Sequence, residues 1–411
     1  MARHADGKVV FVEGGLPGED VDARVLNSGN RFDVARALSV KNESASRVVP
    51  RCPQFGTCGG CVLQHAELRT QVAGKQRWLE DNLARIGGVQ PECMLPPVYG
   101  DEWGYRGRAR FSVRRVDKKG GVLVGFRERR STYVTETREC AVLPPHVSAL
   151  IVPLRELVET LSVRSRLPQI EVAVGDNATV LVFRHLDALS ADDEQKLRHF
   201  ALAGDVHVWV QPRGPDTARP LEPGTSELYY ELPDFGLRLH FRPTDFTQVN
   251  QGVNRILVSR AVRLLDPQPG ERIGDLFCGL GNFSLPLARS GARVIGFEGS
   301  RELVERARSN AAANRLVAQF EEMNLFKPNL APFAPFDKLL LDPPREGAME
   351  VVKSLPPTWP RRLLYVSCDA ATLARDAGML VNAQGFRLVS AGVVNMFPHT
   401  AHVESMALFQ R

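Results

Sequence analysis

The feature that most constrains the fold is a regular alternation of short apolar runs and amphipathic segments from Thr244 to the C-terminus. The apolar runs of strand length are Arg272–Phe277, Arg293–Glu298, Asp337–Asp342 and Leu363–Ser367. Helical periodicity fills the gaps, most clearly over Arg301–Asn314 and Ala371–Val381. We therefore predict an α/β, doubly wound, Rossmann-like domain over residues 244–411.

The first 243 residues are organised differently. Residues 1–45 contain short strand-like segments separated by turn residues, which suit a small OB-like β-barrel: Lys8–Glu13, Val21–Leu26 and Phe32–Val40. Residues 46–243 predict a mixed α+β domain with an antiparallel sheet. Its expected helices are roughly Glu67–Ile86, Val147–Leu161 and Ala191–Leu202, and its expected hairpins are Ala109–Val116 with Val122–Arg127 and Ile170–Val174 with Thr179–Phe183.

Length and composition agree with a globular protein. With 411 residues, of which 44% are apolar, the chain has room for two or three sizeable cores. It lacks the run of roughly 18 apolar residues that a membrane span needs. The first residues also lack the apolar stretch of a signal peptide. We expect a cytoplasmic protein that does not enter a membrane.

Basic residues gather between Tyr105 and Arg130, although the formal net charge of the chain is only +5. The basic residues are Arg106, Arg108, Arg110, Arg114, Arg115, Lys118, Lys119, Arg127, Arg129 and Arg130, and the aromatic residues around them are Tyr105, Phe111, Phe126 and Tyr133. Such a segment can neutralise phosphates and stack on bases. A solvated basic face of a sheet is the alternative interpretation.

The turn after the first strand of the α/β domain has the composition of a nucleoside-binding loop. Gly279 and Gly281, within Asp275–Phe283, let a ligand approach the backbone closely. Glu298 ends the second strand, where a carboxylate can accept hydrogen bonds from ribose hydroxyls. The third glycine of the dinucleotide fingerprint is absent, which favours S-adenosylmethionine. The alternative is a tight turn that requires glycine, with Glu298 simply exposed.

Three chemically distinctive residues follow or precede predicted strands: Asp342, Cys368 and Glu404. The carboxyl ends of parallel strands meet at one edge of a sheet, where ligands bind. Thiolate attack on C6 of uracil makes C5 able to accept a methyl group, and a base must then remove the C5 proton. Cys368 suits the first role and Glu404 the second. A reactive thiolate requires a lowered pKa, to which a helix starting near Ala370 would contribute.

Other interpretations of these residues exist. Cys368 is also consistent with a small buried apolar residue, and Glu404 with an exposed charge at a strand end. His399 and His402 could bind a metal, although hydrogen-bonding roles suit two histidines without further ligands. An amino methyltransferase would use Asp342–Pro344 and would need no thiol.

Seven cysteines in a chain expected to be cytoplasmic indicate metal binding or catalysis rather than disulfides. Three of them form a compact set: Cys52, Cys58 and Cys61. Cys140 is the best fourth ligand, and Cys93 is its competitor. Four thiolates suit a [4Fe–4S] cluster or zinc, and the spacing favours the cluster modestly. His65 would instead complete a Cys3His zinc site.

Together these motifs resemble the RNA uridine-5-methyltransferases, in particular the branch that modifies bacterial large-subunit ribosomal RNA. The similarity runs along nearly the whole chain, and its most specific segments are Cys52–His65, Phe246–Asn250, Asp275–Phe283, Leu341–Arg345, Val366–Asp369 and Met396–Ser405. The resemblance implies an enzyme that uses S-adenosylmethionine to methylate C5 of a uridine in 23S ribosomal RNA, through a covalent Cys–C6 adduct. It implies RNA as the partner, with no DNA, and we expect a monomer.

The resemblance also implies roles by position. The ligands of a [4Fe–4S] cluster would be Cys52, Cys58, Cys61 and Cys140. The cofactor contacts would be Gln248, Phe277, Asn282, Glu298, Asn324 and Asp342. Cys368 would be the nucleophile and Glu404 the general base, and Phe246 would stack on or near a flipped-out uridine. Residues 1–45 would be an RNA-binding TRAM domain.

One departure from the family concerns the N-terminal segment. The family's barrel usually begins with another strand before the segment that matches Ala2–His4, so we expect an upstream start or an incomplete barrel with reduced RNA affinity. The same chemistry on another ribosomal or transfer RNA uridine is an alternative, although the transfer-RNA branch typically lacks the cysteines and the barrel. A non-catalytic iron–sulfur RNA-binding module would leave Cys368 and Glu404 unexplained.

Overall fold

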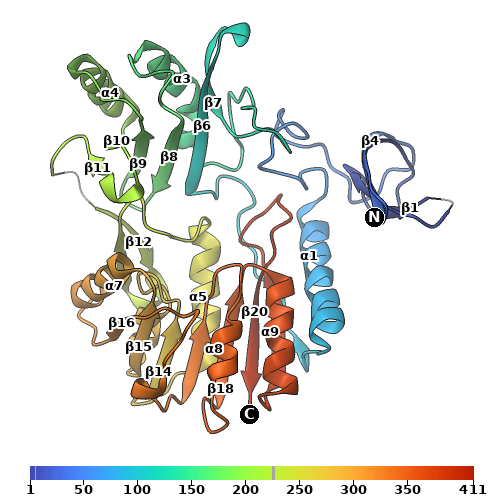
Figure 1. Ribbon diagram of the computed structural model, residues 1–411, viewed down its shortest axis with the longest axis vertical. Helices are drawn as coiled ribbons and strands as arrows, with labels where there is room; N and C mark the ends of the chain where they lie inside the picture. Colours follow the sequence, from blue (N-terminus) through green and yellow to red (C-terminus); the bar gives the residue numbers. More distant parts are fainter. Residues whose placement is uncertain (5, 225–226) are drawn as a thin grey trace.

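The computed structural model describes residues 1–4, 6–224 and 227–411. In Figure 1 an eight-stranded sheet with flanking helices forms the lower half of the molecule. A six-stranded sheet with α3 (Ile151–Thr160) and α4 (Ala191–Gly204) lies above it, and a four-stranded sheet near the N-terminus projects to the side. No helix in the described ranges is long and apolar enough to cross a membrane.

The eight-stranded sheet contains the four predicted parallel strands, which in spatial order are β15 (Arg293–Glu298), β14 (Arg272–Leu276), β17 (Lys338–Leu341) and β18 (Arg362–Ser367). A further parallel strand, β16 (Gln319–Glu322), pairs with β15 at the edge of the sheet and was not among the predicted strands. The two clearest predicted helices are present as α7 (Arg301–Ala313) and α9 (Ala370–Asn382). The alternation of apolar runs therefore predicted this part of the fold correctly.

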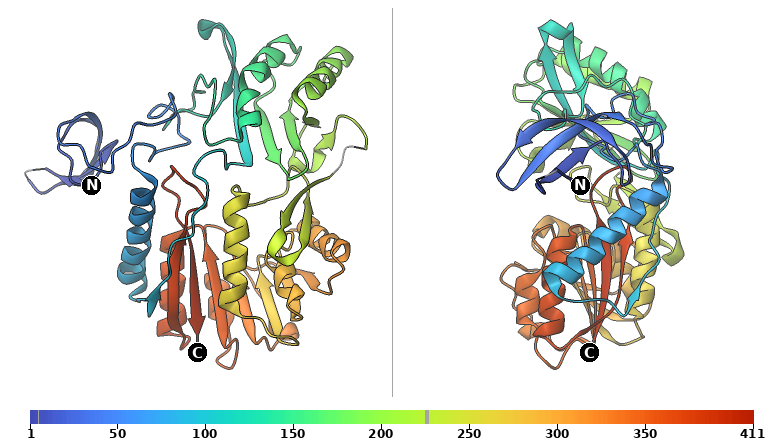
Figure 2. Two further views of the ribbon diagram at one scale, coloured as in Figure 1. Left: turned by 180° about the vertical axis from the view of Figure 1, so that it is seen from behind. Right: turned by 90° about the vertical axis from the view of Figure 1, so that its right-hand side faces the viewer.

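Helices cover both faces of this sheet, as Figure 2 shows. Besides α7 and α9 they are α1 (Leu68–Asn82), α5 (Gln251–Leu265), α6 (Ser284–Arg289) and α8 (Met349–Ser354). Successive strand residues point to opposite faces, so Leu340 packs in one core with α5, α6 and α7, whereas Leu339 packs in the other with α1, α8 and α9. The inner strands β17 and β18 are mostly apolar because both of their faces are buried, whereas the edge strand β16 is mostly polar.

The sheet reverses direction beyond β18. β20 (Glu404–Gln410) lies between β18 and β19 (Arg387–Val394) and runs antiparallel to both. β5 (Cys93–Met94) adds to the outer side of β19. The sequence indicated a final strand after Glu404 but neither β19 nor β5. Because β20 is antiparallel to β18, the start of one strand meets the end of the other, and Ser405 pairs with Ser367.

α1 precedes the α/β domain in sequence but packs directly on it. The helix and the π-helical turn that follows it (Leu83–Gly87) contact α9 and β19. The approach is so close that a Cβ at Gly87 would lie 2.5 Å from the carbonyl oxygen of Ala374. The segment formed by α1 and the π-helical turn is therefore packed as part of the α/β domain, although it precedes the central sheet in sequence.

The central sheet differs in two respects from the prediction. Its spatial order is β11 (Arg219–Pro220), β10 (His207–Gln211), β9 (Thr179–Arg184), β8 (Gln169–Val174), β6 (Arg108–Val116) and β7 (Gly121–Gly125). The sheet is mixed rather than antiparallel, because α4 forms a crossover between β9 and the parallel β10. The helix expected over Val147–Leu161 is divided into α2 (Pro145–Ala149) and α3, since Pro153 cannot continue an uninterrupted helix.

A separate hairpin links the central sheet to the α/β domain. It consists of β12 (Leu228–Leu232) and β13 (Leu237–Phe241), which pair with each other in antiparallel register. Tyr230 and Phe241 of this hairpin are buried in the same core as α5 and α7. The hairpin thus belongs to the packing of the α/β domain, which the sequence patterns had not indicated.

The N-terminal strands form an open sheet. Their order is β1 (Ala2–Arg3), β2 (Val9–Glu13), β4 (Phe32–Val40) and β3 (Val21–Ser28). Within the described residues β1 and β3 do not pair with each other, so these strands form an open sheet rather than a closed barrel. Val10 and Ala35 are the buried apolar residues of this sheet.

Buried ion pairs attach this small sheet to the rest of the molecule. The Arg47 guanidinium donates from Nε and Nη2 to the two carboxylate oxygens of Glu19, each over 2.6 Å. The Glu19 side chain is 0% exposed. These hydrogen bonds lower the pKa of Glu19 to about 2. Glu13 makes a second set of pairs with Arg129 and Arg130 of the central domain.

We expect Glu19→Gln to release the N-terminal sheet. Removing one partner of a buried pair leaves the Arg47 charge uncompensated and should lower the local opening free energy by about 3 kcal/mol. The pKa of Glu19 is lowered from 4.5, so the wild-type contribution is intact above pH 4.5 and is lost as pH falls toward about 2. Hydrogen exchange of β2 and β4 measures the effect.

The control for this experiment is Asp22→Asn, which breaks the exposed pair between Asp22 and Lys41. An exposed pair contributes less than about 1 kcal/mol, so β2 and β4 should keep their protection. Equal losses of protection in Glu19→Gln and Asp22→Asn would contradict the docking role of Glu19.

Candidate active site

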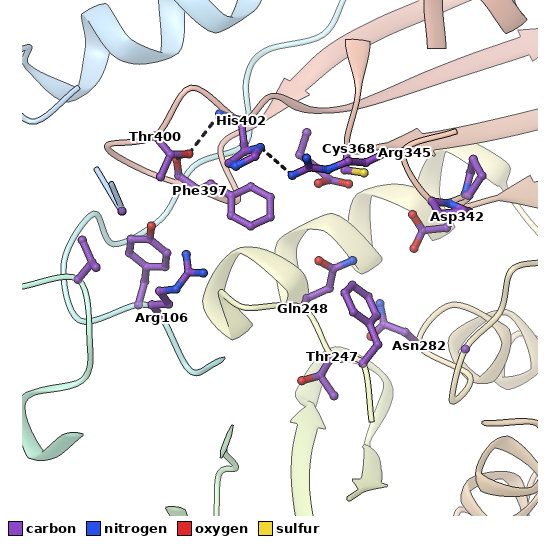
Figure 3. Close-up of a pocket in the computed structure, with 18 of the residues that line it drawn as sticks. Arg106, Thr247, Gln248, Asn282, Asp342, Arg345, Cys368, Phe397, Thr400 and His402 are labelled. Atoms are coloured by element: carbon purple, nitrogen blue, oxygen red, sulfur yellow. Dashed lines mark hydrogen bonds between the residues drawn. The ribbon is translucent and has the colours of Figure 1, made fainter. Parts of the chain in front are cut away.

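One cavity of about 1010 Å³ lies between the carboxyl ends of the parallel strands and the central domain. All the residues to which the resemblance assigns a role line it: Cys52, Cys58, Cys61, Cys140, Phe246, Gln248, Phe277, Asn282, Glu298, Asn324, Asp342, Cys368 and Glu404. Figure 3 shows Cys368, Arg345 and His402 along one side of this space, with Gln248 and Asn282 across from them. The fold therefore gathers residues that are up to 352 positions apart, from Cys52 to Glu404.

The glycine loop after β14 has the backbone that close ligand approach requires. Gly279 and Gly281 have φ of 54° and 98°, and Phe277 also has a positive φ of 66°. The Gly279 amide donates to Glu298 Oε2 over 3.0 Å, and Glu298 Oε1 accepts from the amides of Gly299 and Ser300. The Glu298 carboxylate is therefore held in place beside the loop rather than simply exposed.

Asn282 ends the glycine loop and is held by residues from outside it. Its Oδ1 accepts from Tyr230 Oη over 2.8 Å and from Asn254 Nδ2 over 3.0 Å. Its Nδ2 donates to Asn254 Oδ1 over 3.0 Å. Tyr230 and Asn254 come from β12 and α5, and no local sequence signal connected them to the loop.

The segment that carries Phe246 and Gln248 is held by the start of β6. Arg108 Nη2 donates to the carbonyl oxygen of Asp245 over 2.9 Å, and the Gly107 amide donates to that of Val249 over 2.8 Å. The Phe246 side chain is 69% exposed. An aromatic ring that is held at the cavity and left open to solvent is available to a ligand rather than to the core.

The basic segment does not form one uniform surface. Arg106 lines the cavity, whereas Arg108 is partly buried and donates to the carbonyl oxygen of Asp245. Arg110 and Arg115 are paired with Glu171 and Asp117. The interpretation as RNA-binding residues therefore fits Arg106, whereas the interpretation as a solvated basic face of the sheet fits Arg110 and Arg115.

Cys368 and Glu404 reach the cavity from neighbouring antiparallel strands. Cys368 directly follows β18, and the next residue, Asp369, caps α9 by accepting from the amides of Ala371 and Thr372. Glu404 is the first residue of β20 and is 3% exposed. The strand pairing between β18 and β20 sets the two side chains at one edge of the sheet, close to Asp342 at the end of β17.

Burial dominates the electrostatics at this edge. It raises the pKa of Glu404 to about 7 and that of Asp275, beneath the glycine loop, to about 7. The pKa of Asp342 is raised well above its usual value by burial and by the charges of Glu404 and Asp275. The cavity thus concentrates carboxyl groups and would be stabilised by a cationic ligand.

The protein alone does not provide the lowered pKa that a reactive thiolate at Cys368 requires. Burial and the nearby Glu404 and Asp342 raise the pKa of Cys368 to about 11, and Arg345 offsets this only in part. The predicted helix after Cys368 is present, but it does not outweigh these effects. A thiolate here requires additional positive charge in the cavity.

The loop 395–403, which leads into Glu404, is held by residues that the sequence had not indicated. Lys75 of α1 donates to Asn395 Oδ1 and to the carbonyl oxygen of Phe397 over 2.7 and 2.8 Å. His399 Nδ1 lies 3.1 Å from Gln71 Nε2, and its Nε2 lies 3.0 Å from the carbonyl oxygen of Glu102. His399 therefore has the hydrogen-bonding role rather than the metal-binding one.

The four candidate cluster ligands share the cavity, but Cys93 does not share it with them. Cys93 lies exposed on β5 at the edge of the eight-stranded sheet, whereas Cys140 is buried and lines the cavity with the first three cysteines. Burial raises the pKa of Cys61 to about 11 and that of Cys140 to about 12. Across residues 1–4, 6–224 and 227–411, no group of three or more His, Cys, Asp or Glu side chains is arranged to hold a metal ion.

Comparisons with known proteins agree with this geometry. A family model described as tRNA (Uracil-5-)-methyltransferase matches residues 67–325 and 317–411. The 23S rRNA (uracil(1939)-C(5))-methyltransferase RlmD of Thiobacillus denitrificans is 60% identical over 412 residues, which cover 99% of this chain and 95% of the relative. RlmD of Dechloromonas aromatica is 55% identical over 98% of this chain and 95% of its own length.

A solved structure extends the similarity to the fold of the whole chain. The tRNA (uracil-54, C5)-methyltransferase of Pyrococcus abyssi, in complex with S-adenosyl-L-homocysteine, has a TM-score of 0.76 and 25% identity. The match covers 98% of this chain and 96% of that chain. With these relatives and the matching family model, the chain belongs to the uracil-5-methyltransferase family of RNA-modifying enzymes.

Proposed function

We propose that this protein transfers a methyl group from S-adenosylmethionine to C5 of a uridine in 23S ribosomal RNA. The observation that carries the proposal is the meeting of Cys368 and Glu404 at one cavity that also contains the glycine loop. The relatives named as 23S rRNA (uracil(1939)-C(5))-methyltransferases, at 55 and 60% identity, indicate the substrate.

The cavity has complementary groups for the proposed cofactor. Glu298 is placed to accept from ribose hydroxyls, and Phe277 forms an edge-to-face pair with Phe326 at 6.2 Å that offers an apolar surface to adenine. Asp342 and Glu404 suit the positive sulfonium. Bound cofactor would therefore favour the Cys368 thiolate, because its positive charge opposes the carboxyl groups that raise the thiol pKa.

Cys368 and Glu404 divide the chemistry between them. The Cys368 thiolate bonds to C6 of uracil, and the resulting enolate carbon C5 takes the methyl group from sulfur, which leaves S-adenosylhomocysteine. Glu404 then accepts the C5 proton, and the C6–S bond breaks to restore the aromatic ring and the thiolate. A carboxyl with a pKa of about 7 is matched to this role, because both of its protonation states are accessible near neutral pH.

The uridine must leave its stack to reach Cys368. The exposed ring of Phe246 is positioned to stack on the displaced base, and Arg106 lines the same cavity for phosphate or base contacts. The four-stranded N-terminal sheet projects to one side of the molecule (Figure 1), and we propose that it adds RNA contacts, as a TRAM domain would.

We also propose that Cys52, Cys58, Cys61 and Cys140 hold a [4Fe–4S] cluster. All four line the same cavity, and cysteine thiolates are the ligands that iron–sulfur clusters use. Each of the four iron atoms of such a cluster would bind one thiolate, so the cluster would join Cys140 to the first three cysteines. The methylation chemistry uses no electron from it, so we assign it a structural role.

The covalent step predicts a trapped complex in Glu404→Gln. Without the base, the C5 proton stays and the C6–S bond cannot break, so unmodified ribosomal RNA with S-adenosylmethionine should give a protein–RNA adduct on a denaturing gel. The adduct should disappear in Glu404→Gln with Cys368→Ala, and mapping its position names the uridine. If wild type methylates the RNA and Glu404→Gln forms no adduct, the assigned roles are wrong.

Transfer RNA is the second candidate substrate, because the solved relative from Pyrococcus abyssi is named for a transfer RNA uridine. The same trapping reaction distinguishes the two. An adduct with transfer RNA and none with 23S ribosomal RNA would overturn the substrate proposed here while leaving the chemistry in place.

Burial of Glu404 predicts a dependence of stability on pH. The pKa is raised from 4.5 to about 7, so the folded form gains from protonation; this gain is full below pH 4.5 and is lost as pH rises through about 7. Glu404→Gln cannot ionise and avoids the loss. Its unfolding free energy should exceed that of wild type by roughly 3 kcal/mol at about pH 8 and by little at about pH 4.

Calorimetric unfolding of both proteins across this range measures the difference. Glu346→Gln, an exposed carboxyl outside the cavity, is the control and should show no such trend. A constant difference between Glu404→Gln and wild type at all pH values would rule out a raised pKa at Glu404.

The cluster proposal predicts different outcomes for cysteines inside and outside the cavity. Cys58→Ala and Cys140→Ala should lose iron and visible absorbance after anaerobic purification, and should unfold at lower temperature. Cys93→Ala should retain the iron and the visible absorbance, because Cys93 is exposed on β5. Wild type that contains zinc in place of iron, or full iron content in Cys140→Ala, would contradict the assignment.

A further inference from the structure

The side-chain amide of Asn282 has most of its hydrogen-bonding groups occupied by neighbouring residues. Its oxygen has two lone pairs, and both are used by Tyr230 Oη and Asn254 Nδ2, over 2.8 and 3.0 Å. One N–H of its Nδ2 is used by Asn254 Oδ1, over 3.0 Å. What Asn282 can still offer to the cavity is therefore one N–H donor and no acceptor.

The partners of Asn282 are themselves fixed. Asn254 is 0% exposed on α5, and Tyr230 is 2% exposed on β12. The two asparagines exchange a reciprocal pair of hydrogen bonds, so neither amide can turn over alone without bringing two like groups together. Burial raises the pKa of Tyr230, which keeps its phenol a neutral donor across the physiological range.

We propose that Tyr230 and Asn254 are positioning residues that orient Asn282 so that its free N–H binds the α-carboxylate of the amino-acid part of the cofactor. This inference rests on the proposed cofactor, S-adenosylmethionine, and names the contact that selects its amino-acid end. Neither positioning residue needs to touch the reacting atoms.

The carboxylate is the ligand group that this donor fits best. The ribose hydroxyls have an acceptor in Glu298, and the adenine has the aromatic surface of Phe277 and Phe326. An ammonium group has no lone pair for an N–H donor. On the nucleophile's side a ligand carboxylate would meet the carboxyl groups of Asp342 and Glu404, and Arg345 there is hydrogen-bonded to His402 Nδ1 over 3.2 Å, so we place the carboxylate on the opposite side.

That opposite side carries neutral groups. Figure 3 shows the side chains of Thr247, Gln248 and Asn282 together, across the cavity from Cys368 and Arg345. An amide whose acceptor oxygen is already occupied presents no competing negative end to an approaching carboxylate. The pre-oriented donor also avoids the entropy of fixing a rotamer when the ligand binds.

The test compares two ligands that differ in the carboxylate. S-Adenosylhomocysteine contains the amino-acid part, and 5′-methylthioadenosine lacks it. In calorimetric titrations of the full chain, Tyr230→Phe and Asn254→Ala should each weaken S-adenosylhomocysteine about tenfold, the scale of a hydrogen bond to a charged group. Both variants should bind 5′-methylthioadenosine as wild type does.

Tyr229→Phe is the matched control, because Tyr229 lies next to Tyr230 on β12 but its ring faces Arg238, 4.1 Å away. It should leave both affinities unchanged. Equal weakening of both ligands by Tyr230→Phe would show a general packing role and overturn the inference, as would unchanged affinity for S-adenosylhomocysteine in Tyr230→Phe. Wild type that fails to bind S-adenosylhomocysteine would overturn the proposed cofactor itself.

Discussion

The site depends on the antiparallel pairing of β20 with β18. In a purely parallel sheet the first residue of a strand lies at the edge opposite to the ligands. Because β20 is reversed, its first residue, Glu404, lies at the same edge as the end of β18, from which Cys368 follows. The pairing of the two strands therefore holds the proposed nucleophile and the proposed base at one edge of the sheet.

This arrangement places carboxyl groups and a thiol together in a poorly solvated space. Asp275, Asp342 and Glu404 raise one another's pKa or are raised by burial, and the Cys368 thiol is kept protonated in the protein alone. The same environment favours a ligand that brings positive charge. Under the proposed function, Cys368 would be most reactive when the cofactor is bound, which would limit side reactions of its thiolate.

The segment that follows Cys61 is joined by hydrogen bonds to the loop 395–403, which leads into Glu404. The amides of Val62 and Leu63, directly after Cys61, donate to the carbonyl oxygen of His399. Gln71 and Lys75 of α1 bind the same loop through His399 and Asn395. The proposed cluster is thus connected to the position of Glu404 by a short run of backbone, which agrees with a structural role for it.

The sequence by itself determined the parallel α/β domain, the glycine loop and the candidate catalytic and ligand-binding residues, because apolar periodicity and motif spacing are local properties. Only the tertiary structure decided the reversal of β20, the open N-terminal sheet and the mixed central sheet, since these depend on strand pairing between distant segments. It also decided the partners of Asn282: Tyr230 and Asn254 carry no motif, and hydrogen bonds across 52 and 28 positions exist only after the cores have packed. The raised thiol pKa has the same origin, because burial and neighbouring charge are properties of the folded cavity rather than of Cys368 and its sequence neighbours.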